Sequence, residues 1–224
     1  MYLTKMPING RRSGAAKLLS SPQAMHAAVQ SAFPPGSLES AGGRALWRVD
    51  RSGDHEVSLY LVSPLEPDLS HVVEQAGWQS GEMWQTRDYR PLLTRLEQGQ
   101  RWAFRLTANP VFNGYKTGRD WSDTKPLAHV TVEQQQRWLL DRTERSGFRV
   151  PDGSHGEPAL QVVDRSMLRF GKGGHRVVVS SATFDGILEV SDPEALARTL
   201  TQGLGRAKAY GCGLLTLAPL ASGH

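Results

Sequence analysis

The hydrophobic and polar positions in the first part of the chain predict a strand followed by a helix. Residues 1–8 alternate as a strand does. Ser21-Pro22 then offers an N-cap residue followed by proline at the first helical position. The helix expected over about 22–33 has an apolar stripe at i, i+4, i+7 and i+8, formed by Met25, Val29, Ala32 and Phe33. His26 lies beside this stripe, near its edge.

The rest of the first half completes the order βαββαβ. Two alternating segments, 46–49 and 57–62, predict strands joined by a polar turn. A short helix is expected over 68–76 and a weaker strand over 83–92. This order of elements is that of a ferredoxin-like module.

The second half repeats the order. A strand is expected over 101–106, and the polar segment 112–125 reads as a loop. Thr131 and Gln134 form a capping-box pattern at the start of a helix that Gly147 ends. The remaining elements are strands over 159–170 and 176–190, a helix over 193–201 capped by Asp192, and a strand over 214–217. The sequence thus predicts an α+β fold of two tandem ferredoxin-like (βαββαβ) domains, residues 1–97 and 98–224.

The composition is that of a folded protein and excludes several kinds of site. Of 224 residues, 39% are hydrophobic and 21% charged, which does not fit a disordered chain. Cys212 is the single cysteine, so an intramolecular disulfide and a cysteine-based zinc site are excluded. The histidines lack H-x-x-x-H spacing, and we expect no metal and no cofactor. No segment approaches the roughly 20 apolar residues of a membrane span, so we expect a cytoplasmic protein without a membrane partner.

Basic residues gather in stretches that lack acids. The formal net charge is +4. No acid precedes Glu39, none lies between Glu97 and Asp120, and none follows Glu194. Such stretches suit a surface that binds phosphates. Charge by itself leaves open that they are solvated faces without a ligand.

The segment Gly203–Gly213 holds four glycines together with Arg206 and Lys208. Glycines let backbone amides approach a phosphate, and the cations neutralise its charge. A mononucleotide loop follows a strand and opens a helix, whereas this segment follows a helix and precedes a strand. An extended RNA backbone therefore fits better than a mononucleotide. The alternative is a helix C-cap and turn that leads to the last strand.

Several blocks of the chain resemble the CasE-type CRISPR RNA-processing endoribonucleases, in the same order and over essentially the whole length. The blocks are MYLTK at the amino end, FRLTANP (104–110), WLLDR (138–142), FDGILEV (184–190) and the glycine-rich GLGRAKAYGCGLLTLAPL (203–220). The resemblance implies two ferredoxin-like domains and cleavage of precursor CRISPR RNA beside the repeat hairpin. It also implies assembly into the type I-E Cascade surveillance complex.

The resemblance also implies a role for His26 as the catalytic residue. RNA is cut without metal when a 2′-hydroxyl attacks the adjacent phosphate and two groups handle the protons, and histidine suits either role near neutral pH. Many relatives have a tyrosine where this chain has Gln23, whose amide cannot exchange protons but can position the phosphate or the hydroxyl. We expect Lys17 to stabilise the charge on the phosphate.

The expected RNA-binding residues fall into three groups. Two precede the expected catalytic helix, four crowd a strand pair that corresponds in the family to an RNA-contacting hairpin, and six belong to the glycine-rich segment. They are Arg11 and Arg12; Arg165, Arg169, Lys172 and Arg176; and Gly203, Gly205, Arg206, Lys208, Gly211 and Gly213. Two alternatives stay open: a catalytically inactive RNA-hairpin-binding subunit of the same complex, and an assembly protein whose basic face meets an acidic protein.

Overall fold

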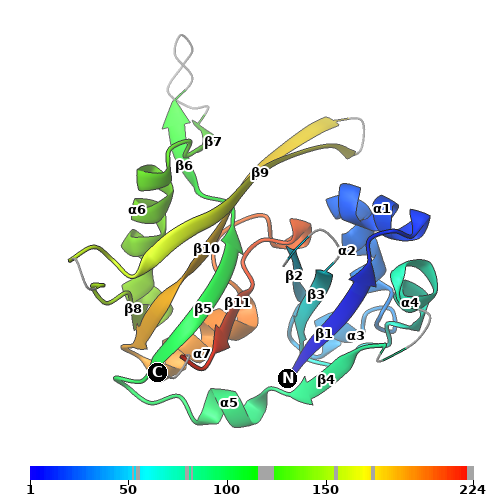
Figure 1. Ribbon diagram of the computed structural model, residues 1–224, viewed down its shortest axis with the longest axis horizontal. Helices are drawn as coiled ribbons and strands as arrows, with labels where there is room; N and C mark the ends of the chain where they lie inside the picture. The colour runs from blue at the N-terminus through cyan, green and yellow to red at the C-terminus, as the bar shows by residue number, and fades with distance from the viewer. Residues whose placement is uncertain are drawn as a thin grey trace.

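Two antiparallel sheets stand side by side in the computed structural model, each with helices packed on it (Figure 1). The structure describes all residues except 52, 54, 55, 79, 80, 82, 116–123, 154, 155, 173, 174 and 221–224. The central residues of the predicted turn over 171–175, and most of the predicted loop over 112–125, lie outside the described residues.

The N-terminal sheet has the order β2-β3-β1-β4. Its strands are β1 (Tyr2–Asn9), β2 (Leu46–Arg51), β3 (Glu56–Ser63) and β4 (Gln85–Asp88). The helices of this half are α1 (Ser13–Ser20), α2 (Pro22–Gln30), α3 (Ser37–Ser40) and α4 (Ser70–Ala76). Buried side chains of β1, such as Met6 and Ile8, form one core with Met25 and Val29 of α2 and Val72 of α4. The four strands and the helices between them follow the predicted βαββαβ order, with additional short helices.

The first half differs from the prediction in one strand and in one helix that was missed. The weak strand expected over 83–92 is divided into β4 and the short helix α5 (Arg90–Thr94), because Pro91 lacks the N–H that a strand would need and the Asp88 carboxylate accepts from the Arg90 backbone N–H at 3.0 Å. Helix α1 was not predicted. It packs closely on α4: a Cβ on Gly14 would lie 2.4 Å from the carbonyl oxygen of Gln75.

The C-terminal sheet is built around the long strand β10 (His175–Val190), which pairs with three others. Its order is β11-β5-β10-β8, with β9 also paired to β10. The other strands are β5 (Arg101–Ala108), β8 (Phe148–Arg149), β9 (Leu160–Lys172) and β11 (Leu215–Ala218). The helices are α6 (Val132–Thr143), η1 (Glu144–Ser146), α7 (Pro193–Gln202) and η2 (Lys208–Tyr210). The capping box of Thr131 and Gln134 and the Asp192 cap are both confirmed.

The ends of the predicted loop over 112–125 form a strand pair instead. Strands β6 (Val111–Tyr115) and β7 (Thr124–Ala128) are antiparallel, with Val111 opposite Ala128. The pattern hid this hairpin because Gly, Asp and Lys between the strands favour a loop. The residues between β6 and β7 lie outside the described part of the chain.

The two halves are joined by a shared core and a buried polar network. Leu46 and Val62 of the N-terminal sheet belong to the hydrophobic core of the second half. Arg48 of β2 donates hydrogen bonds to the backbone carbonyl oxygens of Arg105 and Leu214, at 2.9 and 3.0 Å. The arrangement of the two sheets is therefore fixed by buried contacts. The division at residues 97 and 98 stays a prediction.

Candidate nucleic-acid interface

Helix α2 presents His26 at the border between its buried and exposed faces. The helix begins as predicted, because the Ser21 hydroxyl oxygen accepts from the Ala24 N–H at 3.2 Å. The predicted apolar stripe is buried, with Met25 at 1% exposure. His26 is half-buried and Gln23, one turn earlier, is exposed. The His26 imidazole thus lies next to solvent, and the packing of the buried side chains of α2 fixes the position of its backbone.

Helix α4 contacts the start of α1 and the last turn of α2 through hydrogen bonds. The Arg12 guanidinium, just before α1, donates to the carbonyl oxygens of Val73 at 3.1 Å, Gly77 at 3.0 Å and Glu74. These are carbonyls at the end of α4, where a cation is favourable. His71 Nε2 lies 2.9 Å from the Ala28 carbonyl oxygen of α2. Arg12 therefore has a structural role, and the RNA contact expected of it, which stays a prediction, would require the guanidinium to leave α4.

Two other predicted cations near α2 are exposed. Lys17 lies in the last turn of α1, and Arg11 lies in the turn after β1, where its backbone N–H donates to Asn9 Oδ1 at 3.1 Å. An exposed cation can meet a phosphate at a small cost in desolvation.

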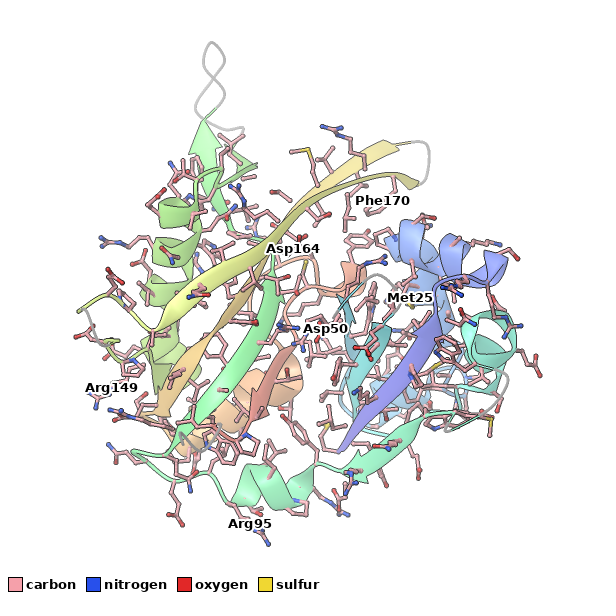
Figure 2. The ribbon with its side chains drawn as sticks, in the orientation of Figure 1. Met25, Asp50, Arg95, Arg149, Asp164 and Phe170 are labelled. Carbon is pink, nitrogen blue, oxygen red and sulfur yellow. The ribbon has the colours of Figure 1, made fainter. Side chains whose placement is uncertain are left out.

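A cleft of about 190 Å³ separates α1 and α2 from the second half. Leu18, Pro22 and Met25 line one side, and Leu168 and Tyr210 line the other. The Phe170 and Tyr210 rings meet edge to face above it, with centroids 4.7 Å apart. Figure 2 shows the hairpin that carries Phe170 reaching toward the helix that carries Met25. Sequence reasoning missed both aromatic residues, because no pattern relates β9 to η2.

The hairpin of β9 and β10 carries two of the predicted cations, Arg165 and Arg169, on the face opposite this cleft. Asp164, Ser166 and Leu168 line the cleft. Side chains alternate along a strand, so Arg165 and Arg169 point to the other side, where both are exposed. Arg165 Nη1 donates to the Val130 carbonyl oxygen at 3.3 Å, and Arg169 Nη2 approaches Met167 Sδ at 3.0 Å.

The backbones of Lys172 and Arg176 lie at the far end of the same hairpin, opposite His175 and Gly171 respectively. The four predicted cations thus belong to one hairpin. Two surfaces can be described: the border of α2, and the outer face of the hairpin, which carries Arg165 and Arg169.

The glycine-rich segment is tied closely to the core. Gly211 has a φ of +80°, and a Cβ there would lie 2.7 Å from the Trp47 ring. The Leu204 N–H donates to the Gly213 carbonyl oxygen at 2.9 Å, and the Gly213 N–H donates to the Thr107 carbonyl oxygen at 2.7 Å. These two amides are therefore occupied by the fold. The turn interpretation accounts for much of the glycine content, and phosphate contacts at Gly203, Gly205, Gly211 and Gly213 stay a prediction.

The two cations of this segment differ in environment. Arg206 is exposed, whereas Lys208 is half-buried in η2, which packs against α2 and β2. Burial lowers the pKa of the Lys208 ammonium, and the positive charge of Arg44 lowers it further. The segment thus brings η2, the element that carries Lys208, against the helix that carries His26.

Other chemistry has little support in the described part of the chain. It contains no group of three or more His, Cys, Asp or Glu side chains placed to hold a metal ion. Burial raises the pKa of the Cys212 thiol to about 12, which keeps it protonated and unsuited to nucleophilic attack. No helix in the described ranges is long and apolar enough to cross a membrane.

Comparison with known proteins agrees with these features. The family model described as CRISPR associated protein matches residues 1–219. The CRISPR-associated endoribonuclease Cse3 of Thermus thermophilus is 34% identical over 226 residues, which are 98% of this chain and 100% of that protein. The CRISPR system Cascade subunit CasE of Escherichia coli is 29% identical over 130 residues, 56% of this chain and 62% of that protein.

Solved structures show the same fold. Thermus thermophilus Cse3 bound to an RNA representing a pre-cleavage complex matches with a TM-score of 0.78 and 33% identity, over 97% of this chain and 98% of that one. Cas6e from Escherichia coli matches with a TM-score of 0.68 and 25% identity, over 98% and 100%. The predicted fold class and the predicted family are confirmed. The chain therefore belongs to the CRISPR associated protein family and is a CasE-type endoribonuclease.

Proposed function

We propose that this endoribonuclease cuts precursor CRISPR RNA beside the repeat hairpin without a metal ion. A 2′-hydroxyl attacks the adjacent phosphate, which leaves a 2′,3′-cyclic phosphate and a 5′-hydroxyl. The observation that carries the proposal is the position of His26, half-buried at the border of a well-packed helix. The relatives support it, since one is named an endoribonuclease and its structure holds a pre-cleavage RNA.

His26 acts as the general acid or base at the cleavage point. Its neutral and protonated forms are both accessible near neutral pH. Gln23 is exposed one turn before it and positions the phosphate or the hydroxyl by hydrogen bonding. Lys17 in α1 offsets the negative charge that develops on the phosphate.

The product hairpin stays bound through phosphate contacts. Exposed Arg11, Arg165, Arg169 and Arg206 supply cations on both halves of the molecule. RNA duplexes are recognised largely by shape and phosphate contacts, which such a distribution serves. The bound enzyme then joins the other subunits of a Cascade complex, of which the Escherichia coli relative is named a subunit.

Cleavage of a repeat-hairpin RNA in EDTA tests the proposal. We expect the wild type to cut, with a 2′,3′-cyclic phosphate end seen by mass spectrometry, and His26→Ala to bind the RNA with unchanged affinity but not to cut it. His129→Ala is the matched control, because His129 is another half-buried histidine, next to α6 in the second half. Loss of cleavage in EDTA, or a His26→Ala variant that cuts normally, would contradict the proposal.

The second candidate is an inactive subunit that only binds the hairpin. Gln23 favours it, because its amide replaces the tyrosine of many relatives and cannot exchange a proton. The same assay decides: hairpin binding without cleavage in the wild type would establish this alternative. Absence of RNA binding would instead support an assembly protein with a protein partner.

A further inference from the structure

The proposed reaction needs a second group besides His26. When the 2′-oxygen attacks, one group takes its proton and another gives a proton to the departing 5′-oxygen. Helix α2 supplies His26, whereas Gln23 has no proton to give at neutral pH. The element of the second half that packs against α2 is η2. It carries Lys208 and Tyr210, both of which have a proton to donate.

We propose that Lys208 is a catalytic residue that donates the proton to the 5′-oxygen leaving group. The inference rests on the proposed function, because it assigns the partner of His26 in that reaction. It adds proton donation to the phosphate contact expected of this lysine. Its support comes from how the loop is built and how the lysine is surrounded.

The backbone around Lys208 is held in an unusual conformation. Ala207, the residue before it, has a φ of +60°, the one positive φ of a non-glycine residue among those described. Such a conformation persists where the surroundings fix it, and it is concentrated at functional sites. The hydrogen bond from the Leu204 N–H to the Gly213 carbonyl oxygen closes the loop. The strained turn thus leads directly into Lys208 on η2, the element that packs against α2.

The side chain of Lys208 lies over a glycine. A Cβ on Gly213 would come within 3.2 Å of Lys208 Cγ, so the missing side chain makes room for the lysine stem. The start of the lysine side chain therefore lies against the loop whose backbone positions it. A positioned donor of this kind needs little reorganisation in the transition state.

The surroundings also make Lys208 a stronger acid than an exposed lysine. Its burial and the positive charge of Arg44 both lower the pKa of the ammonium. A donor whose pKa moves toward the working pH transfers its proton more readily.

Tyr210 is the other proton donor of η2, and its ring has a packing role. It meets Phe170 edge to face at 4.7 Å and lines the cleft between the halves. Tyr210→Phe removes the hydroxyl and keeps the ring, so it separates the two residues experimentally.

The step balances in atoms and protons. The bond between the 2′-oxygen and phosphorus forms as the bond between phosphorus and the 5′-oxygen breaks. His26 takes the 2′-hydroxyl proton, and the Lys208 ammonium gives one proton to the 5′-oxygen and becomes a neutral amine. Solvent then restores both protonation states.

Single-turnover cleavage of two substrates by the full-length protein tests the inference. One is the normal repeat-hairpin RNA, and the other has sulfur in place of the 5′-bridging oxygen, since a thiolate leaves without a proton. We expect Lys208→Met and Lys208→Arg to cut normal RNA about 10²- to 10³-fold more slowly, the range of general acid catalysis. Both variants should cut the sulfur substrate at the wild-type rate. Arginine keeps the charge, so RNA binding by Lys208→Arg should be unchanged.

Three outcomes would decide against the inference. Cleavage of normal RNA by Lys208→Arg at the wild-type rate would mean that the positive charge at this position is needed and proton donation is not. Equal losses on both substrates would indicate a structural role. If Tyr210→Phe cuts normal RNA slowly but cuts the sulfur substrate at the wild-type rate, Tyr210 is the proton donor. His26→Ala should stay slow on both substrates, because it lacks the base; cleavage by that variant would overturn the proposed function and not this inference.

Discussion

The Nε of Arg48 donates to Oδ1 of Asp50 at 2.6 Å, and both side chains are buried, at 2% and 9% exposure, where the two sheets meet. The same guanidinium reaches carbonyl oxygens of the second half and the Thr216 hydroxyl at 2.9 Å. Figure 2 shows Asp50 between the two halves. Because α2 belongs to one half and η2 to the other, this ion pair helps to set how they face each other.

Removal of Asp50 should destabilise the protein strongly. Asp50→Ala leaves the buried Arg48 charge without its partner, which costs about 3–5 kcal/mol in the free energy of unfolding. Urea denaturation measures the change. Glu194→Ala is the control, because the ion pair of Glu194 with Arg198 is exposed and should contribute little. Equal effects of the two substitutions would show that the Arg48 network does not hold the halves together.

Alanine at Gly211 should destabilise the fold more than alanine at Gly36. Both glycines have a positive φ, +80° and +73°, which costs an L-residue roughly 1–2 kcal/mol. At Gly36 a Cβ meets nothing within 4 Å, whereas at Gly211 it meets the Trp47 ring. Thermal melting compares the two variants. Similar losses would mean that the loop can move away from Trp47, and would favour the phosphate-binding interpretation of this glycine.

Local signals in the sequence were enough to place some elements. Ser21 and Pro22 fixed the start of α2, and the capping box of Thr131 and Gln134 fixed the start of α6. These signals act within one helical turn, so they need no knowledge of the rest of the fold.

Features that depend on tertiary contacts could not be predicted. Helix α1 is short and depends on Gly14 lying against α4, and Arg48 reads as an ordinary strand cation until the second sheet covers it. The candidate site likewise has a part that the sequence pattern predicts and a part that depends on tertiary contacts. The pattern placed His26 at the edge of its stripe, but it could not show that η2 packs against α2.

Substitution of Arg12 should affect stability and leave RNA contacts unchanged. Its guanidinium is held by carbonyls at the end of α4, and charge-assisted hydrogen bonds contribute about 1.5–3 kcal/mol. Arg12→Ala should lower the denaturation midpoint and keep the salt dependence of RNA binding. Arg11→Ala, at the exposed neighbouring residue, should instead weaken the salt dependence of RNA binding. A weaker salt dependence in Arg12→Ala would show that Arg12 leaves α4 to bind phosphate.

The outer face of the β9–β10 hairpin should govern binding and not the rate of cutting. Arg165 and Arg169 are exposed on the face opposite the cleft beside α2, so they cannot reach a phosphate held at that cleft. Each alanine substitution should weaken binding of the repeat hairpin and reduce the slope of log affinity against log salt by about 1. The single-turnover rate at saturating protein should stay the same.

Arg95→Ala is the matched control for the hairpin, because this exposed arginine follows α5 at the far edge of the molecule (Figure 2). It should change neither affinity nor salt slope. If the hairpin variants bind normally but cut slowly, the hairpin must close over the cleft during the reaction, and the two surfaces act as one. If Arg95→Ala weakens binding as much as they do, the RNA is held by the general positive field rather than by the hairpin.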